Sequence, residues 1–197
     1  MPILNPELLA TFRGLLDDAR KAADPEPTAM TLATVDSKGQ PSARTVLLKA
    51  VDADGFVFYT NTLSRKSRQL SANPHVALLF FWKTLPGGVQ VKVEGAVQAV
   101  SDAEADAYFA SRPRQSQIGA WASLQSQLLD SRTTFEQRIA DYEREFAGGE
   151  VPRPPHWSGY RVQPHHLEFW YGAQFRLHER HVHDWVDGAW QHKMLYP

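Results

Sequence analysis

The chain has 197 residues, 43% of them hydrophobic, and its 21 Lys and Arg against 22 Asp and Glu give a formal net charge of −1. This length fits one globular domain, and the near-neutral charge gives no overall attraction to nucleic acid or to an anionic membrane. No cysteine is present, which excludes disulfides and thiolate chemistry, and without a signal peptide or an apolar run of membrane-spanning length we expect a cytoplasmic protein.

A helix is predicted near the N-terminus. Asn5 can cap it, and Pro6 suits its first turn, where a missing N–H costs nothing. Apolar residues then recur at helical spacing, at Leu8, Leu9, Phe12, Leu15, Leu16 and Ala19. Because prolines at 25 and 27 end the pattern, we assign residues 1–26 to an N-terminal helix.

Residues 27–100 show the two-residue period of β-strands. Strand-like runs at 31–35, 45–48 and 56–59 are separated by Asp- and Gly-containing turn signals, and a short helix is expected over 64–72. The clearest alternation covers 89–94 and resumes after Gly95, so one face of this strand should be buried. We assign these residues to the strands of a barrel.

Helical patterns occupy residues 101–150, over 102–111, 116–124 and 133–146. Strand-like pieces follow in residues 151–197, over 160–162, 166–170, 176–183 and 189–195. The order of strands, then helices, then strands predicts an α+β fold whose last strands close one antiparallel barrel or sheet. No repeat or linker divides the chain, so we expect a single domain of residues 1–197.

Basic and hydroxyl side chains gather at strand ends and helix starts. In the run 44–49, Arg44, Val46 and Leu48 would face one side of a strand, and Thr45, Leu47 and Lys49 the other. After Tyr59 and Thr60, the residues Ser64, Arg65 and Lys66 stand at a predicted helix start, where unpaired N–H groups attract anions. Tyr108 and Arg112 lie four residues apart on one predicted helix face, and Ser116 begins the next helix.

Taken alone, each of these groups also fits an ordinary solvated surface. Dinucleotide-binding glycine loops, P-loops and nucleophile elbows are absent from the sequence. Two anion pockets without those motifs suggest two phosphorylated ligands, one a cofactor and the other a substrate.

The C-terminal region adds an aromatic residue beside a row of cations. Trp170 precedes Arg176, His178 and Arg180, which would point to one face of a strand, although a chance alternation on a solvated face would look similar. His181 and His183 also share a strand face. With no third ligand evident, we interpret them as surface histidines of an edge strand and expect no metal.

With these residues assembled, the chain closely resembles the pyridoxamine (pyridoxine) 5′-phosphate oxidase family. The matching motifs are Arg44-x-Val-Leu-Leu-Lys49, Tyr59-Thr60 with Ser64-Arg65-Lys66, the run 111–121, and the run 167–180. They keep their order between Pro27 and Pro197, which is more specific than any single motif. The resemblance implies an FMN-binding split β-barrel with flanking helices, which forms a homodimer with FMN at the interface.

The resemblance also implies roles for individual residues. FMN contacts would come from Arg44, Val46, Leu47, Lys49, Tyr59, Thr60, Ser64, Arg65, Lys66, Gln90, Gln125, Ser126, Trp170 and Arg180. The substrate phosphate would be bound by Lys49, Tyr108, Arg112 and Ser116. Arg176 and His178 would lie over the pyridine ring, as substrate contacts and as the catalytic residues.

The implied reaction oxidises pyridoxamine or pyridoxine 5′-phosphate to pyridoxal 5′-phosphate, a step of vitamin B6 metabolism. A hydride would pass from C4′ to flavin N5, and O2 would reoxidise the flavin and give H2O2. Tyr171 and Met194 depart from the family pattern, and residues 1–5 lack the Arg and Tyr of the arm that covers the substrate in many relatives.

Two alternatives remain open. A flavin oxidase of another aromatic substrate, such as a phenazine precursor, would not need Tyr108, Arg112 and Ser116. A non-catalytic FMN-binding or flavin-reductase-like barrel should lose Arg176 and His178.

Overall fold

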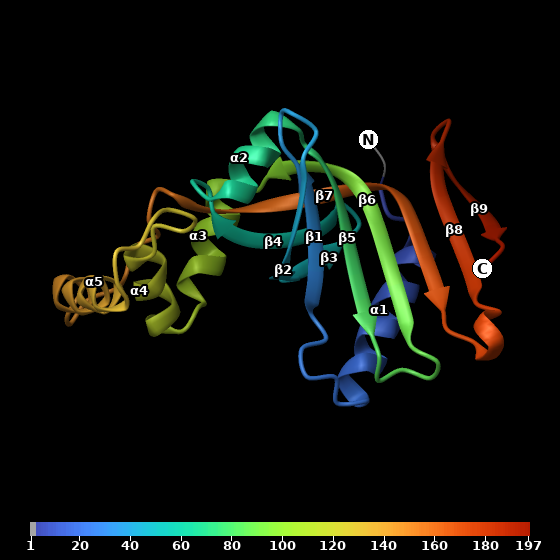
Figure 1. The fold of residues 1–197 in the computed structure, drawn as a ribbon, viewed down its shortest axis with the longest axis horizontal. Coiled ribbons are helices and arrows are strands. Elements are labelled where there is room, and N and C mark those ends of the chain that lie inside the picture. The colour runs from blue at the N-terminus through green and yellow to red at the C-terminus, as the bar shows by residue number, and fades with distance from the viewer. Residues whose placement is uncertain (1–2) are drawn as a thin grey trace.

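A computed structural model describes residues 3–197; residues 1 and 2, part of the short N-terminal segment considered above, lie outside it. Within this part of the chain, nine strands form one antiparallel sheet in the order β2-β1-β5-β6-β7-β4-β3, and β8 and β9 extend it from β7. The strands are β1 (Ala29–Val35), β2 (Pro41–Leu47), β3 (Ala50–Asp52), β4 (Gly55–Asn61), β5 (His75–Trp82), β6 (Val89–Ala99), β7 (Trp157–Tyr171), β8 (Glu179–Val186) and β9 (Ala189–Leu195). The helices are α1 (Pro6–Lys21), α2 (Arg65–Ala72), α3 (Asp102–Ala110), α4 (Arg114–Ala122) and α5 (Arg132–Glu145). The predicted α+β fold is confirmed, and the curled sheet is a split β-barrel (Figure 1).

Helix α1 begins where the sequence predicts, because the Asn5 side chain accepts a hydrogen bond of 2.8 Å from the Leu8 amide. Its apolar face packs onto the sheet. The Phe12 ring, fully buried, meets Phe56 at 4.9 Å and Phe80 at 5.0 Å between ring centroids, both edge-on. Burying one such side chain contributes about 1.5–3 kcal/mol, so this face fixes α1 against the sheet.

Strand β7 connects the two ends of the sheet. The sequence predicts two separate pieces, over 160–162 and 166–170, but the structure has one strand that pairs with β4 along its first half and with β8 along its second. The prediction was wrong because the strand continues past Pro164 through a bulge: the pairing shifts between Glu94 and Gly95 of β6, and His165 is the extra residue on β7. A side chain at Gly95 would put its Cβ 2.2 Å from the Gln163 carbonyl oxygen, so the bulge requires glycine.

The predicted strand over 176–183 is also corrected. Gly172 packs so closely on Gly87 that an added Cβ would lie 1.9 Å from the Gly87 carbonyl oxygen, and β7 ends there. A short 3-10 turn (Gln174–Arg176) follows, in which Phe175 and Arg176 have positive φ angles of 56° and 64°. Strand β8 therefore begins only at Glu179, and Arg176 does not alternate with Arg180 on a strand face.

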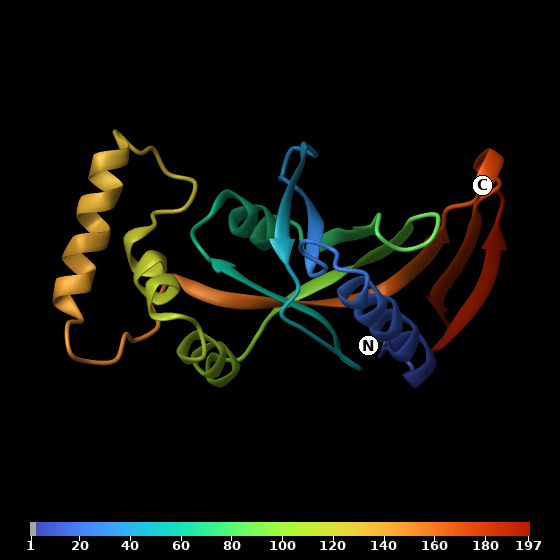
Figure 2. The same cartoon turned by 90° about the horizontal axis from the view of Figure 1, so that it is seen from below.

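Two structural units lie at opposite ends of an elongated molecule. Helices α3, α4 and α5 form one end, and the β8–β9 hairpin forms the other, with the sheet between them (Figures 1 and 2). A second, small core of Phe109, Ile118, Val151 and Trp157 lies beneath the three helices. Between residues 3 and 197, none of the helices combines the length and the apolar character needed to cross a bilayer.

Candidate functional site

A buried lysine lies at the start of α2. Lys66 is only 9% exposed, and its ammonium donates to Thr60 Oγ1 at 2.9 Å and to Gln125 Oε1 at 2.8 Å. Burial first, and then the charge of Arg44, lower the pKa of Lys66 to about 8. In the described part of the chain, no carboxylate forms an ion pair with this lysine. Its charge is therefore left for an anionic ligand.

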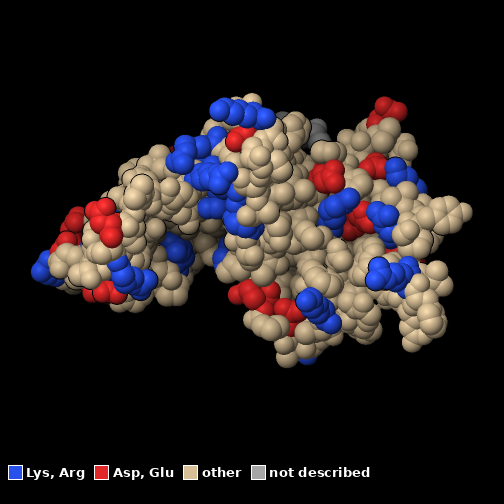
Figure 3. Space-filling view, viewed as in Figure 1, with Lys and Arg blue, Asp and Glu red and all other residues tan. Residues whose placement is uncertain are grey.

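Arg44 stands beside this lysine, on the covered side of β2. Its guanidinium donates to the Leu32 carbonyl oxygen at 3.0 Å and to Thr34 Oγ1 at 2.6 Å. Burial and the nearby charge of Arg65 lower the pKa of Arg44. Figure 3 shows Lys and Arg side chains gathered on the molecular face where α2 lies in Figure 1. With the Ser64 side chain capping α2, these cations form a positively charged candidate anion site, here called the first pocket.

A second anion pocket adjoins the first. Arg112 lies in the turn after α3 rather than on its face, because the helix ends at Ala110 and Pro113 follows. The Nη1 atom of Arg112 is buried and has no hydrogen-bond partner among the described residues. A cavity of about 370 Å³ is lined by Tyr59, Thr60, Asn61, Arg112, Ser116, Gly119, Ala120, Ser123, Gln125 and Trp157. Because Thr60 and Gln125 also hold Lys66, the two pockets share a wall.

Tyr108 reaches this region by stacking. Its ring lies 4.1 Å from the Tyr59 ring at an interplanar angle of 13°. Burial, then the charges of Glu104 and Tyr108, raise the pKa of Tyr59 to about 12, so Tyr59 keeps its proton as a neutral hydroxyl. Lys49, in contrast, is exposed and lines a separate hollow beside α1 with Arg13.

The remaining predicted residues gather at the other end of the sheet. Gln90 of β6 and Arg180 of β8 both pair with Trp170 of β7, so the three side chains share one face. The rings of His178 and Trp170 lie 4.5 Å apart, and Arg176 is exposed nearby in the 3-10 turn.

Glu168 is a member of this group that the sequence did not single out. It is 6% exposed, accepts from Arg180 Nε at 2.6 Å and pairs with Lys92 Nζ at 3.1 Å. The hydrogen bond from Arg180 is the main cause that lowers the pKa of Glu168. The alternation of β7, which turns Glu168 and Trp170 to the same face, was the signal that could have revealed it.

The two groups are far apart in a single chain. Tyr59 pairs with Gly159, and Trp170 lies eleven residues further along β7, about 35 Å of strand at about 3.3 Å per residue. Figures 1 and 2 agree on this separation, since α3–α5 and β8–β9 lie at opposite ends. The predicted site residues of one chain therefore form two separate groups, here called half-sites. The first holds Arg44, Val46, Leu47, Tyr59, Thr60, Ser64, Arg65, Lys66, Tyr108, Arg112, Ser116, Gln125 and Ser126, and the second holds Gln90, Trp170, Arg176, His178 and Arg180.

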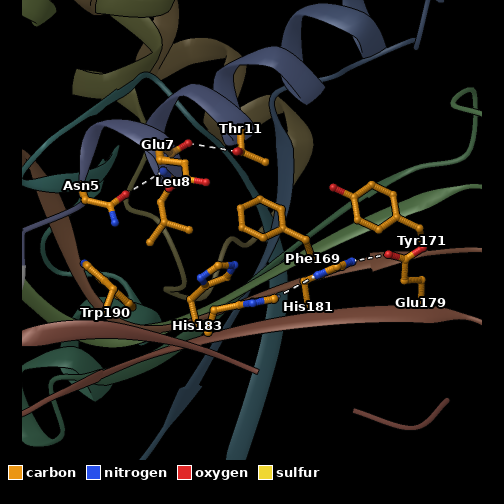
Figure 4. Close-up of a pocket in the computed structure, with 11 residues that line it drawn as sticks. Asn5, Glu7, Leu8, Thr11, Phe169, Tyr171, Glu179, His181, His183 and Trp190 are labelled. Atoms are coloured by element: carbon orange, nitrogen blue, oxygen red, sulfur yellow. Dashed lines mark hydrogen bonds and ion pairs between the residues drawn. The ribbon is translucent and has the colours of Figure 1, made fainter. Parts of the chain in front are cut away.

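The paired histidines lie outside both half-sites. Strand β8 is covered by β9 and is not an edge strand, so the predicted surface histidines are instead half-buried. With Phe169 and Trp190 they line a cavity of about 590 Å³ beneath α1 (Figure 4). This cavity is on the face of β7–β8 opposite to Trp170, because His181 pairs with Phe169. Across residues 3–197, His, Asp and Glu side chains form no group suited to a metal ion.

Comparison with known proteins gives two family matches. The model described as pyridoxamine 5′-phosphate oxidase matches residues 16–144, and that described as the pyridoxine 5′-phosphate oxidase C-terminal dimerisation region matches residues 157–197. A pyridoxine/pyridoxamine 5′-phosphate oxidase of Xanthomonas euvesicatoria pv. vesicatoria is 58% identical over 200 residues, covering 100% of both chains. The enzyme of that name from Myxococcus xanthus is 54% identical and covers 99% of this chain and 94% of its own.

Solved structures agree on the fold. PhzG from Burkholderia lata, crystallised with tetrahydrophenazine-1-carboxylic acid, superposes with a TM-score of 0.91 at 30% identity, covering 98% of each chain. A pyridoxamine 5′-phosphate oxidase-related, FMN-binding protein from Nostoc punctiforme gives a TM-score of 0.76 at 16% identity over 98% of each chain, and supports the fold alone. Matches to both family models, together with relatives more than half identical over their full length, show that the chain belongs to the pyridoxamine 5′-phosphate oxidase family of FMN-dependent oxidoreductases.

Proposed function

We propose that this protein binds FMN and oxidises pyridoxamine and pyridoxine 5′-phosphates to pyridoxal 5′-phosphate. One observation carries the proposal: the buried Lys66 and the half-buried Arg112, whose Nη1 atom is buried, lack carboxylate partners in the described chain and lie in neighbouring sites that share Thr60 and Gln125. A buried cation without a counter-ion is costly, and a phosphate ester supplies the missing charge. Two adjoining pockets fit one phosphorylated cofactor and one phosphorylated substrate.

The first pocket has the chemistry of an FMN phosphate site. Arg44, Lys66 and the N-terminus of α2 would hold the phosphate, helped by Ser64 and Arg65. The side-chain oxygens of Thr60 and Gln125 accept hydrogen bonds from Lys66 and would keep its ammonium in place. When bound, FMN supplies the hydride acceptor and, through O2, the reoxidation that yields H2O2.

The second pocket would bind the substrate phosphate through Arg112 and Ser116, which line it, and through Tyr108, which stacks on Tyr59. Lys49, the fourth residue expected here, lines the separate hollow beside α1. Positioning by these groups would hold C4′ of the substrate over the flavin ring. His178 Nδ1 accepts a hydrogen bond of 3.1 Å from the Ala173 amide, so a neutral His178 carries its proton on Nε2. That N–H would donate to the substituent on C4′, while the guanidinium of Arg176 would lie over the pyridine ring.

A homodimer would bring the two half-sites together. Large apolar side chains are exposed at both ends of the protomer: Leu124, Leu128 and Leu129 beside the first half-site, and Phe175, Leu177 and Tyr196 beside the second. A two-fold axis would place the apolar patch beside the first half-site of one protomer against the patch beside the second half-site of its partner. The first half-site of each protomer would then face the second half-site of the other. The match of residues 157–197 to a dimerisation region supports this assembly.

One assay distinguishes the proposed function from the two alternatives. Oxygen uptake is measured with pyridoxamine 5′-phosphate, pyridoxine 5′-phosphate and their unphosphorylated forms, on protein whose flavin absorbance has been recorded. We expect yellow protein that oxidises the phosphorylated forms and is much less active on the others. Bound flavin without turnover would favour a non-catalytic barrel. Turnover of a reduced phenazine carboxylic acid instead would favour an oxidase like the structurally similar PhzG.

A further inference from the structure

Arg112, a half-buried cation, packs against aromatic rings and not against a carboxylate. Its guanidinium carbon lies 4.8 Å from the Trp157 ring centroid and 5.4 Å from that of Phe109. Burial is the leading cause that lowers the pKa of Arg112, and the ion pairs of the described chain do not include it. Aromatic faces attract a cation without neutralising it or occupying its N–H donors. The donors of Arg112 therefore stay available for a ligand, as the unpaired Nη1 shows.

Trp157 is fixed in place by the fold around it. It is 6% exposed and begins β7, where it pairs with Asn61 of β4. Its carbonyl oxygen accepts from Arg153 Nη1 at 2.8 Å, and the same guanidinium bonds Asp102 of α3 at 2.8 Å. The backbone of Trp157 and helix α3, which precedes Arg112, are thereby joined through one arginine.

The same indole supports Tyr108 through an aromatic stack. The Trp157 ring lies 5.2 Å from the Tyr59 ring at 5°, and Tyr59 lies 4.1 Å from Tyr108 at 13°. Gly159 leaves room for this stack, since an added Cβ would stand 2.7 Å from the Tyr59 ring. One rigid aromatic platform thus contacts both Arg112 and, through Tyr59, the second residue assigned to the substrate phosphate.

We propose that Trp157 is a positioning residue for the substrate phosphate, acting through Arg112, and so contributes to selection of phosphorylated over unphosphorylated substrates. The inference rests on the proposed function of the Arg112 pocket. Trp157 lines that cavity but offers the phosphate no charge of its own. Its effect should appear in substrate affinity and not in FMN binding.

The test compares Trp157→Met, which keeps apolar bulk without a ring, with Trp157→Phe, which keeps a ring. Cation–π contacts of this kind are worth roughly 0.5–2 kcal/mol, which corresponds to a rise of about 2- to 30-fold in KM for the phosphorylated substrate. We expect Trp157→Met to show this rise with kcat and the FMN dissociation constant nearly unchanged. Trp157→Phe should show a smaller rise, because a phenyl ring attracts a cation more weakly than an indole does. The inhibition constant of inorganic phosphate should rise in parallel.

Trp121→Met is the matched control. Trp121 packs on the same small core and donates to the Pro152 carbonyl oxygen at 2.7 Å, but no contact joins it to Arg112 in the described structure. This variant should lose stability without a change in KM. If Trp157→Met does not fold, the milder Trp157→Phe still tests the idea, since exchange of an indole for a phenyl ring should weaken phosphate inhibition measurably.

A double-mutant cycle with Arg112→Ala decides whether Trp157 acts through Arg112. In that background, Trp157→Met should add little, since the group it positions is gone. Equal effects of Trp157→Met in both backgrounds would overturn the inference, and so would an unchanged KM in Trp157→Met. A wild-type protein that ignores phosphorylated vitamers would instead overturn the proposed function, and inorganic phosphate binding would then test Trp157 separately.

Discussion

Replacing Lys66 by methionine tests whether the first pocket is built for an anion. The ammonium is buried beside Arg44, and its partners in the described chain are the neutral oxygens of Thr60, Gln125 and Ser64. In FMN-free protein this charge opposes folding, because the unfolded chain keeps it fully hydrated. Lys66→Met removes the charge while keeping a similar length of apolar side chain.

The magnitude follows from the pKa of Lys66, which falls from 10.5 to about 8 on folding. Below pH 8 both states carry the proton, so the stability of the protein does not change with pH through this group. Between pH 8 and 10.5 the unfolded chain binds the proton and the folded protein does not, so stability rises with pH. At 1.36 kcal/mol per pKa unit the full gain is about 3 kcal/mol, of which about 2 kcal/mol is present by about pH 9.5.

The assay is chemical unfolding of FMN-free wild type and Lys66→Met at about pH 7 and about pH 9.5. Wild type should gain about 2 kcal/mol relative to the variant over this interval. Other titrating groups are common to both proteins, and the hydrogen bonds lost in Lys66→Met are lost at both pH values. Both contributions therefore cancel when the change in stability with pH is compared between the two proteins. Parallel stability curves for the two proteins would refute the reasoning. Lys66→Met should also bind FMN more weakly at pH 7, measured by flavin fluorescence.

Four further predictions concern other parts of the molecule. Arg112→Ala should raise KM for the phosphorylated vitamers by about 10- to 100-fold, with FMN binding retained; equal loss of both would show that the pockets are wrongly assigned. Leu128 is 96% exposed, so Leu128→Asp should leave the protomer folded but weaken the dimer at least about tenfold in sedimentation velocity, and an unchanged dimer would exclude this loop from the interface. Gly55→Ala should destabilise by more than about 2 kcal/mol, because φ is +126° and a Cβ would meet the Val162 carbonyl oxygen at 2.0 Å. Gly14→Ala, in α1 with nothing within 4 Å of the added Cβ, should instead stabilise by about 0.5–1 kcal/mol in the same unfolding assay.

Local patterns in the sequence were sufficient for much of the fold. The cap at Asn5 and the helical spacing after it located α1, and the prediction of a strand over 189–195 matches β9. These elements depend on nearest neighbours along the chain, on one cap or one turn, so the sequence carries their signal directly. The residues assigned to the first half-site stand mostly at strand ends and helix starts, and their role stays a prediction.

The residues of the C-terminal motif could be recognised in the sequence, but their arrangement in space could not. The sequence placed Arg176 and Arg180 on one strand face, whereas the positive φ of Arg176 sets it in a turn before β8 begins. The close packing of Gly172 on Gly87, eighty-five residues away in the chain, ends β7 there, and no local pattern contains that contact.

By itself, then, the sequence determined most of the elements, the family and the two sets of candidate site residues. Only the tertiary structure decided that β7 holds these sets at opposite ends of the protomer, and that Glu168 and Trp157 belong beside them. The reason is physical. Helix capping and strand alternation depend on residues that are neighbours in the chain. The pairing of strands and the packing of Arg112 on Trp157 depend on contacts between segments that meet only after folding.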